Sequence, residues 1–167
     1  MGNDDKIIIE IDGAFECEEL KKKTIRVLSF SLSGQDYCVK IEDAKETVKL
    51  QRVTAIPNMP EFVAGVINLH GEIIALLDIR PFLNIEKKDI TRTSRVIVTD
   101  VTGVPIGILV DEIKNIIDIE EESIQPPLAT LRGVQAEYIK GHIELDGRIF
   151  ALLDLKRILK CEDVKSL

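Results

Sequence analysis

Tryptophan is absent from the sequence, and aromatic residues make up only 4% of its 167 residues. Hydrophobic residues nevertheless account for 45% of the chain, a fraction that can fill a core, and Ile, Val and Leu dominate among them. Because β-branched side chains favour extended backbone, this composition predicts a folded protein that is rich in β-strands.

Positive charge is also in short supply. The chain has 22 Lys and Arg against 29 Asp and Glu, which gives a net charge of −7. An acidic surface repels nucleic-acid phosphates and anionic lipid headgroups. Five Phe and two Tyr also supply few aromatic platforms on which bases could stack. We therefore expect no nucleic-acid partner.

Long apolar runs are missing as well. No run approaches the roughly 20 residues that a membrane helix needs, and the N-terminus carries Asp4 and Asp5 where a secretion signal carries basic residues. The three cysteines, Cys17, Cys38 and Cys161, are widely spaced and form no CxxC pair, which is typical of reduced thiols. The sequence thus predicts a cytoplasmic protein with no membrane insertion.

Motifs that carry catalysis are not found. GxSxG, P-loop and GxGxxG patterns are absent. The two histidines, His70 and His142, have no cysteine near them, whereas a zinc site needs about four convergent ligands. A catalytic Cys–His pair is not excluded by the sequence, because a Cys and a His that are distant in sequence can meet in the folded protein. We predict that the protein is not an enzyme and that it holds no metal and no cofactor.

A repeat is the most informative feature that the sequence does contain. Glu61–Asn84 (EFVAGVINLHGEIIALLDIRPFLN) aligns with Glu137–Lys160 (EYIKGHIELDGRIFALLDLKRILK), with 11 identical positions of 24. Upstream, Ile25–Gly34 aligns more weakly with Ser94–Gly103. Self-similarity over this length indicates an internal duplication.

Each copy has the pattern of five short strands with closely spaced turns. Asp146–Gly147 in the second copy is a favoured type I′ hairpin turn, and His70–Gly71 occupies the same corner of the first. The sequence therefore predicts an all-β fold: two five-stranded β-barrels packed together, with short helices. The predicted ranges are an N-terminal flexible tail at 1–22, a first barrel at 23–90, a second barrel at 91–160 and a C-terminal tail at 161–167. Exchange of strands between the two barrels is left open.

Asp78 and Asp154 stand at the same place in the two copies, each just before a predicted short helix. A carboxylate there can accept hydrogen bonds from the free N–H groups of the first helical turn. The two carboxylates could instead face each other and share a proton, which would make the protein a small-molecule-binding or hydrolytic β-barrel. The Asp-Thr/Ser-Gly signature of aspartic proteases is missing. Capping is therefore the favoured interpretation, and the hydrolytic barrel is the alternative.

Four segments carry a resemblance to a known family: Val27–Phe30 (VLSF), Tyr37–Asp43 (YCVKIED), Ile56–Pro60 (IPNMP) and, most specifically, Phe62–Arg80 (FVAGVINLHGEIIALLDIR). They resemble the CheW family of chemotaxis coupling proteins, and the similarity runs from about residue 24 to residue 160. The resemblance implies that each barrel is SH3-like. It also implies a non-enzymatic scaffold that joins the cytoplasmic tips of methyl-accepting chemoreceptors to the regulatory domain of the histidine kinase CheA.

The resemblance places the receptor tip in a groove between the barrels, where an apolar helix docks on an exposed apolar strip. By motif position, this groove maps onto Leu28, Ile41, Ala44, Thr47, Val48, Val110 and Ile113. Leu28, Ile41 and Val110 would suit the barrel core equally well. Ala44 and Thr47 fall in a predicted turn region, where side chains are usually exposed.

The resemblance places the kinase contact on the hairpin of the first barrel, at Gly65, Val66, His70 and Gly71. We interpret the glycines at these places in both copies as positions of tight turns and of close strand approach. The chain departs from the family pattern at Ala75, where the family carries Pro, and at His70, where it carries Arg. Neutral His offers one donor and one acceptor in place of a charged fork, so we expect a weaker polar contact at this corner at neutral pH.

Overall fold

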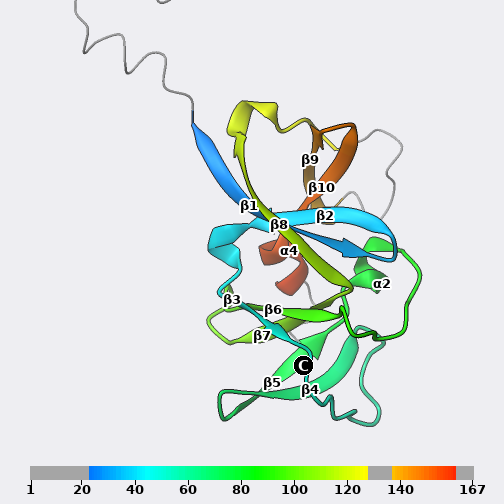
Figure 1. Ribbon diagram of the computed structural model, residues 1–167. Helices are drawn as coiled ribbons and strands as arrows, with labels where there is room; N and C mark the ends of the chain where they lie inside the picture. The colour runs from blue at the N-terminus through cyan, green and yellow to red at the C-terminus, as the bar shows by residue number, and fades with distance from the viewer. Residues whose placement is uncertain (1–22, 128–136, 161–167) are drawn as a thin grey trace, which may run out of the picture.

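The computed structural model describes residues 23–127 and 137–160, which form ten β-strands in two five-stranded sheets. Figure 1 shows one sheet above the other. The first sheet has the order β8 (Glu112–Glu120), β1 (Thr24–Leu32), β2 (Gln35–Lys40), β10 (Arg148–Leu153), β9 (Ile139–Leu145). The second has the order β3 (Glu46–Lys49), β6 (Arg95–Thr99), β7 (Ile106–Val110), β5 (Glu72–Leu77), β4 (Val63–Leu69). The predicted all-β fold with two five-stranded sheets is confirmed.

Short helices follow the strands at four places. They are the 3₁₀-helices η2 (Ile41–Asp43) and η3 (Glu121–Ser123) and the α-helices α2 (Arg80–Leu83) and α4 (Leu155–Leu159). The α-helices follow β5 and β10, which are equivalent strands of the two repeats. The predicted tails at 1–22 and 161–167 lie outside the described residues.

Strands from both repeats contribute to each sheet. The second sheet is built from β3 to β7, which are consecutive in the chain, whereas the first combines β1 and β2 with β8, β9 and β10. Parallel pairing of β2 with β10, and of β5 with β7, joins strands of different repeats. The predicted boundary between residues 90 and 91 therefore separates the repeats of the sequence and does not separate the sheets.

Neither of the two described five-stranded sheets closes into a barrel through a continuous ladder. In the described part of the chain, β3 does not pair with β4, and β8 does not pair with β9. Instead, an isolated bridge joins Thr54 to Val66 in the second sheet, and another joins Gln125 to His142 in the first. Both bridges consist of two backbone hydrogen bonds of 2.9 Å.

Gly65 and Gly141 lie beside these bridges, where a larger residue does not fit. A Cβ atom at Gly65 would lie 2.4 Å from the carbonyl oxygen of Thr54, and one at Gly141 would lie 2.4 Å from that of Gln125. Gly65 also has φ at +147°, which side chains rarely allow. The interpretation of these two glycines as positions of close strand approach is confirmed.

Three hairpin turns share a left-handed backbone at both central residues. The φ pairs are 50° and 82° at Ser33–Gly34, 50° and 89° at His70–Gly71, and 50° and 77° at Asp146–Gly147. Positive φ at both positions is the pattern of a type I′ turn, which matches the twist of the strands that it joins. The predicted hairpin corners are therefore confirmed in both copies.

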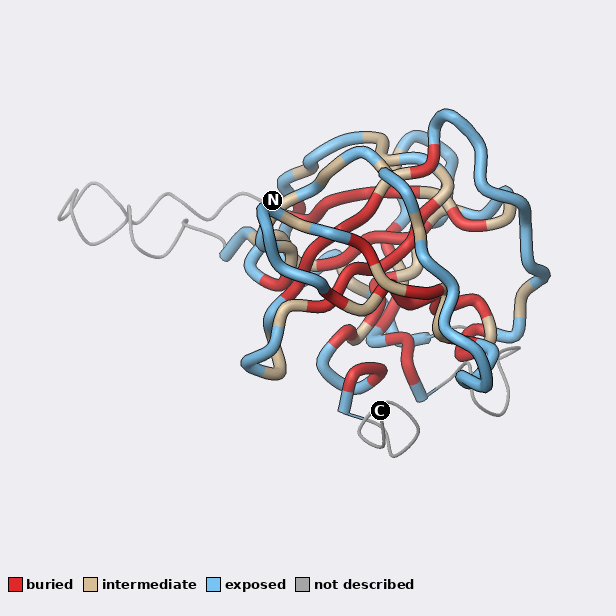
Figure 2. The backbone as a smooth tube through the Cα atoms, turned by 90° about the horizontal axis from the view of Figure 1, so that it is seen from below, coloured by how far each residue is buried: buried red, intermediate tan, exposed pale blue. Residues whose placement is uncertain are grey.

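Buried side chains form three clusters, and the largest lies between the sheets. We call it the central core. Figure 2 shows the buried backbone running through the middle of the molecule. Two smaller clusters fill the sheets themselves, one around Leu76 and Val96 in the second sheet and one around Val27 and Leu152 in the first.

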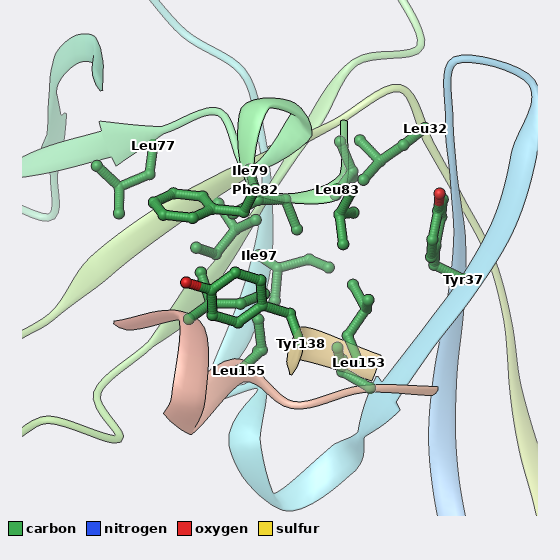
Figure 3. Close-up of a cluster of buried hydrophobic side chains, with 14 of the residues drawn as sticks. Leu32, Tyr37, Leu77, Ile79, Phe82, Leu83, Ile97, Tyr138, Leu153 and Leu155 are labelled. Carbon is green, nitrogen blue, oxygen red and sulfur yellow. The ribbon is translucent and has the colours of Figure 1, made fainter. Parts of the chain in front are cut away.

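The central core contains five of the seven aromatic residues of the chain: Phe30, Tyr37, Phe62, Phe82 and Tyr138. The ring of Phe82, on α2, has its centroid 5.1 Å from that of Phe62 and 5.6 Å from that of Tyr138. Figure 3 shows Phe82 and Tyr138 near Leu155 of α4 in this core. Since both sheets and both α-helices contribute to this core, they are held together as one body.

Candidate interaction surfaces

The structure places the residues of the predicted receptor groove at different depths. Leu28 and Val110 are buried in the central core, with 3% and 0% of their surface exposed. Ile41, Ala44 and Ile113 are half-buried and pack against that core. These five side chains are therefore brought together, but only the last three have surface that a partner can contact.

The other two predicted groove residues lie on β3, which belongs to the second sheet. Thr47 is exposed, and Val48 is half-buried against the smaller core of that sheet. The chain crosses from the first sheet to the second through η2 and the two residues after Asp43. The accessible part of the predicted groove is thus Ile41, Ala44, Thr47, Val48 and Ile113, and we call these residues the η2 edge.

The residues of the predicted kinase contact lie along the β4–β5 hairpin. Gly65 is buried and Val66 is half-buried, and Val66 forms the isolated bridge to Thr54. His70 and Gly71 are exposed at the tip, where the Gly71 N–H donates to Asn68 Oδ1 at 3.0 Å. Gly65 and Val66 therefore fix the shape of the hairpin, while His70 and Gly71 present surface.

His70 has a polar partner on another strand. Its Nε2 lies 3.0 Å from Glu46 Oε1 on β3, and 71% of its side chain is exposed. This contact ties the tip of the hairpin to β3, the strand that also carries Thr47 of the η2 edge. The two predicted surfaces consequently lie on neighbouring elements.

Two exposed apolar residues, one on the same hairpin and one in the β6–β7 connection, were missed by sequence reasoning. Ile73 on β5 is 67% exposed, and Val104 is 61% exposed. Ile73 lies two residues before Ala75 and Val104 lies two residues before Ile106. Ala75 and Ile106 pair at the start of the parallel β5–β7 ladder, so Ile73 and Val104 lie beyond the same end of that ladder. We call these two residues the hairpin patch. The signal was present in the repeat, because the position of Ile73 is also isoleucine in the second copy, at Ile149, which is 50% exposed.

Arg80 forms a buried polar network that also escaped sequence reasoning. The residue is 1% exposed, and its guanidinium donates to Asp78 Oδ1 at 3.0 Å through Nη1 and to Ser33 Oγ at 2.9 Å through Nε. Its Nη2 donates to Asp111 Oδ1. Asp111 Oδ2 in turn accepts from the Ser33 N–H at 2.6 Å. We call this set the Arg80 network.

The Arg80 network connects the two sheets. Ser33 lies in the β1–β2 turn of the first sheet, and Asp78 follows β5 of the second. Asp111 lies between β7 and β8, where the chain passes from the second sheet to the first. A fully buried guanidinium needs its charge balanced and its N–H groups paired. Here two carboxylates balance the charge and, with the Ser33 hydroxyl, accept one hydrogen bond each from Nε, Nη1 and Nη2.

The structure separates the roles of Asp78 and Asp154. Asp154 is the N-cap of α4, and its Oδ1 accepts from the Arg157 N–H at 3.1 Å, as predicted. Asp78 is not a cap in this sense, because the N-cap of α2 is Ile79. Its Oδ1 accepts from Arg80 at both the backbone N–H and Nη1. No hydrogen bond between Asp78 and Asp154 occurs among the described residues, so the shared proton of the hydrolytic alternative is not formed.

The remaining reactive side chains have structural surroundings. Burial raises the pKa of the Cys38 thiol to about 12, so this cysteine stays protonated and unreactive at neutral pH. His142 Nδ1 lies 2.9 Å from the carbonyl oxygen of Pro126. Over residues 23–127 and 137–160, no group of three His, Cys, Asp or Glu side chains is arranged to hold a metal ion. Nor does any helix in these ranges combine the length and apolar character needed to cross a membrane.

Comparison with known proteins agrees with this architecture. The family model for the CheW-like domain matches residues 26–163. The chain belongs to the CheW family. Chemotaxis protein CheW of Thermotoga maritima is 29% identical over 144 residues, which cover 86% of this chain and 93% of that protein. Chemotaxis protein CheW of Bacillus subtilis is 26% identical over 144 residues, covering 84% and 90%.

A solved structure shows the same fold. The crystal structure of the scaffolding protein TtCheW from Thermoanaerobacter tengcongensis superposes with a TM-score of 0.75 at 30% identity, covering 84% of this chain and 96% of that one. The CheW family consists of adaptor proteins of chemotaxis signalling, which defines the class of function for this member. The resemblance inferred from Phe62–Arg80 and the other three segments is thereby confirmed.

Proposed function

We propose that this CheW-family protein is a non-enzymatic scaffold in the cytoplasm that couples the tips of chemoreceptors to the histidine kinase CheA. The observation that carries the proposal is one folded body with two distinct accessible surfaces, the η2 edge and the hairpin patch. Both sheets share the central core, and the Arg80 network ties them together at a second place. A partner on one surface is thus held at a defined position relative to a partner on the other, which lets the state of one bias the other.

The η2 edge suits the receptor tip. Ile41, Ala44 and Ile113 are half-buried apolar side chains beside exposed Thr47, and they rest on the buried Leu28 and Val110. A helical tip recognised through its apolar face needs a shallow strip of this kind on a firm base.

The hairpin patch suits the regulatory domain of the kinase. Exposed aliphatic side chains at the centre of a contact, surrounded by polar groups, are typical of a protein–protein interface. Ile73 and Val104 supply the apolar centre, and Asn68, His70 and Glu72 of the same hairpin supply polar groups around it. Gly65 and Val66 support this contact through the shape of the hairpin, because they hold β4 against the segment that contains Thr54.

The proposal is tested by measuring binding to a receptor-tip fragment and to a CheA regulatory-domain fragment separately. Ile73→Glu places a charge in the hairpin patch, and we expect at least about 30-fold weaker kinase binding with unchanged receptor binding. Thr47→Arg should do the reverse, weakening receptor binding while kinase binding is kept.

Ile149→Glu is the matched control, because Ile149 is the equivalent of Ile73 in the second copy and is 50% exposed on β10. Equal loss of kinase binding in Ile73→Glu and Ile149→Glu would contradict the hairpin assignment. Failure of the unmodified protein to bind either fragment at tens of micromolar would contradict the proposed function itself.

A further inference from the structure

A basic pocket lies where the end of β3 meets the start of β6. It has a volume of about 370 Å³ and is lined by Lys49, Leu50, Gln51, Val53, Ile90, Thr91, Arg92, Ser94 and Arg95. Three of these side chains are cationic, three are aliphatic and none is acidic. The lining of this pocket is therefore positively charged, whereas the chain as a whole has a net charge of −7.

The positive charge of the basic pocket is not used by the described fold. Lys49 and Arg92 form no ion pair or side-chain hydrogen bond within the described residues. Arg95 is held in place, because its Nη1 donates to the carbonyl oxygens of Arg92 and Ser94, both at 2.9 Å. These carbonyl contacts orient the guanidinium without neutralising it, so its charge remains available to an anionic ligand.

The wall that carries Arg92 is preformed. Ser94 is 3% exposed, and its Oγ accepts from the Thr91 N–H at 2.9 Å while its own N–H donates to the Thr91 carbonyl at 3.1 Å. A wall that is ordered before binding loses little conformational freedom when a ligand arrives.

The pocket continues toward the β4–β5 hairpin. A second cavity of about 280 Å³ shares Lys49 and Gln51 with it and is lined further by Val48, Ile67, Asn68, Leu69 and His70. The shared residues make the two cavities neighbours along β3. Two neighbouring cavities with cationic and aliphatic lining fit an extended acidic peptide with aliphatic side chains better than a small anion.

We propose that the basic pocket binds the N-terminal segment of this same chain, residues 4–12 (DDKIIIEID). This segment has four acidic residues against one lysine, and its remaining four residues are isoleucine. In extended form, Ile9-Glu10-Ile11-Asp12 points isoleucines to one side and carboxylates to the other. The isoleucines match Leu50, Val53 and Ile90, of which Ile90 is 52% exposed. The carboxylates match the three cations.

The length of the intervening chain permits this docking. Asp12 is 11 residues and Asp4 is 19 residues from Lys23, the first described residue. At roughly 3.3–3.6 Å per extended residue, these residues reach about 36 Å and about 65 Å. A folded body of this size is roughly 35–40 Å across, so the Asp4 end of the segment can reach across it and the Asp12 end can reach faces nearer to Lys23. Tethering also gives it an effective concentration in the millimolar range, so modest intrinsic affinity is sufficient.

The test compares the full chain with a variant that lacks residues 2–20, which keeps every strand of both sheets. A fluorescent peptide of residues 3–13 is titrated into each and followed by anisotropy. We expect the shortened variant to bind the peptide and the full chain to bind it at least tenfold more weakly, because its own segment occupies the pocket. Lys49→Glu with Arg92→Glu in the shortened variant should weaken binding at least tenfold. Lys140→Glu with Lys156→Glu, an equal change of charge at exposed positions, should not.

Several results would overturn the proposal. One is the absence of peptide binding to the shortened variant at millimolar concentration. Equal binding by full chain and shortened variant would show that the segment does not occupy the pocket. Equal binding of a peptide with the same composition in scrambled order would reduce the effect to general charge attraction. A concentration-dependent dimer of the full chain that disappears on shortening would assign the contact to a second copy. None of these measurements depends on receptor or kinase binding.

Discussion

The junction after β5 and the junction after β10 begin with the same residues, Leu-Leu-Asp, yet they work differently. After β5, Arg80 is buried and holds Asp78, Asp111 and Ser33 together across the two sheets. After β10, the equivalent residue is Lys156, which is exposed on α4. Asp154 is left to cap its own helix.

The difference shows how a duplicated unit can keep its backbone while one copy takes on a new role. Both copies keep the strand, the Asp and the short helix. Among the described residues, the basic side chain of the first copy has acceptors from distant parts of the chain, Asp111 and Ser33, whereas Lys156 has none. Because Asp111 lies where the chain passes between the sheets, its bond to Arg80 links the two sheets. Lys156 makes no equivalent link within the described residues.

Replacement of Arg80 should have the largest effect on stability. Arg80→Ala leaves Asp78 and Asp111 without their cation, and we expect a loss of about 3–5 kcal/mol in the free energy of unfolding. Lys156→Ala, the same truncation in the other copy, should change it by less than about 0.5 kcal/mol. Urea denaturation of both variants measures the difference. Similar losses would show that the two junctions are energetically equivalent and would break the comparison.

Alanine at the two bridge glycines should have an intermediate effect that also differs between the copies. The new Cβ meets a carbonyl oxygen at both sites, so each variant should lose about 1–3 kcal/mol. Gly65→Ala carries a further cost of about 1–2 kcal/mol, because only Gly65 has φ in the left-handed range. The same denaturation measurement should therefore rank Gly65→Ala below Gly141→Ala in stability. If Gly141→Ala were the less stable variant, the positive φ of Gly65 would not carry the expected cost.

The exposed ion pair of Arg26 with Asp118 should have the smallest effect and sharpens the contrast with the Arg80 network. It joins β1 to β8 through a hydrogen bond of 2.8 Å, and both side chains are 60% exposed. The hydrogen bond and charge of Arg26 lower the pKa of Asp118. The pair therefore stabilises the fold above the unfolded-chain pKa of about 3.9, and its contribution disappears as the pH falls through the lower folded value.

The Arg26–Asp118 pair and the Arg80 network are compared by measuring the stability of alanine variants as salt and pH are changed. The small effect of Arg26→Ala at pH 7 should vanish in about 1 M salt, because exposed charges are screened, and at a pH below the lowered pKa of Asp118, because that carboxylate is then protonated. The loss caused by Arg80→Ala should persist in salt. A salt-insensitive Arg26→Ala, or an Arg80→Ala variant rescued by salt, would contradict the distinction between the surface pair and the buried network.

The turns, the close strand contacts and the helix cap were predictable from this sequence because the same local pattern occurs in both copies of the repeat. The turns at His70–Gly71 and Asp146–Gly147 require residues that tolerate positive φ, and the spacing of Gly65 and Gly141 recurs beside each hairpin. Cap formation by Asp154 follows from its position before a short helix. These features depend on neighbours within a few residues, which is the range over which sequence patterns are informative.

Strand pairing and side-chain contacts between distant parts of the chain were not predictable in the same way. Parallel pairing of β2 with β10 depends on which strand lies beside which, and strand periodicity contains no such information. Leu28 and Val110 show the same limit, because a buried strand residue and a groove residue look alike in a run of β-branched and aliphatic residues. Burial of Arg80 depends on Asp111, 31 positions later, and no local pattern signals it.

The order of strands also has a consequence for synthesis of the protein. Arg26 and Asp118, which lie opposite each other on β1 and β8, are 92 positions apart. At about 5–20 residues per second, a ribosome needs roughly 5–20 s to cover that distance. The second sheet emerges as one consecutive segment and can assemble meanwhile, while β1 and β2 wait with their edges unpaired. A nascent or prematurely terminated chain would therefore expose those edges and the apolar face beneath them, which makes it a substrate for chaperones until β10 is complete.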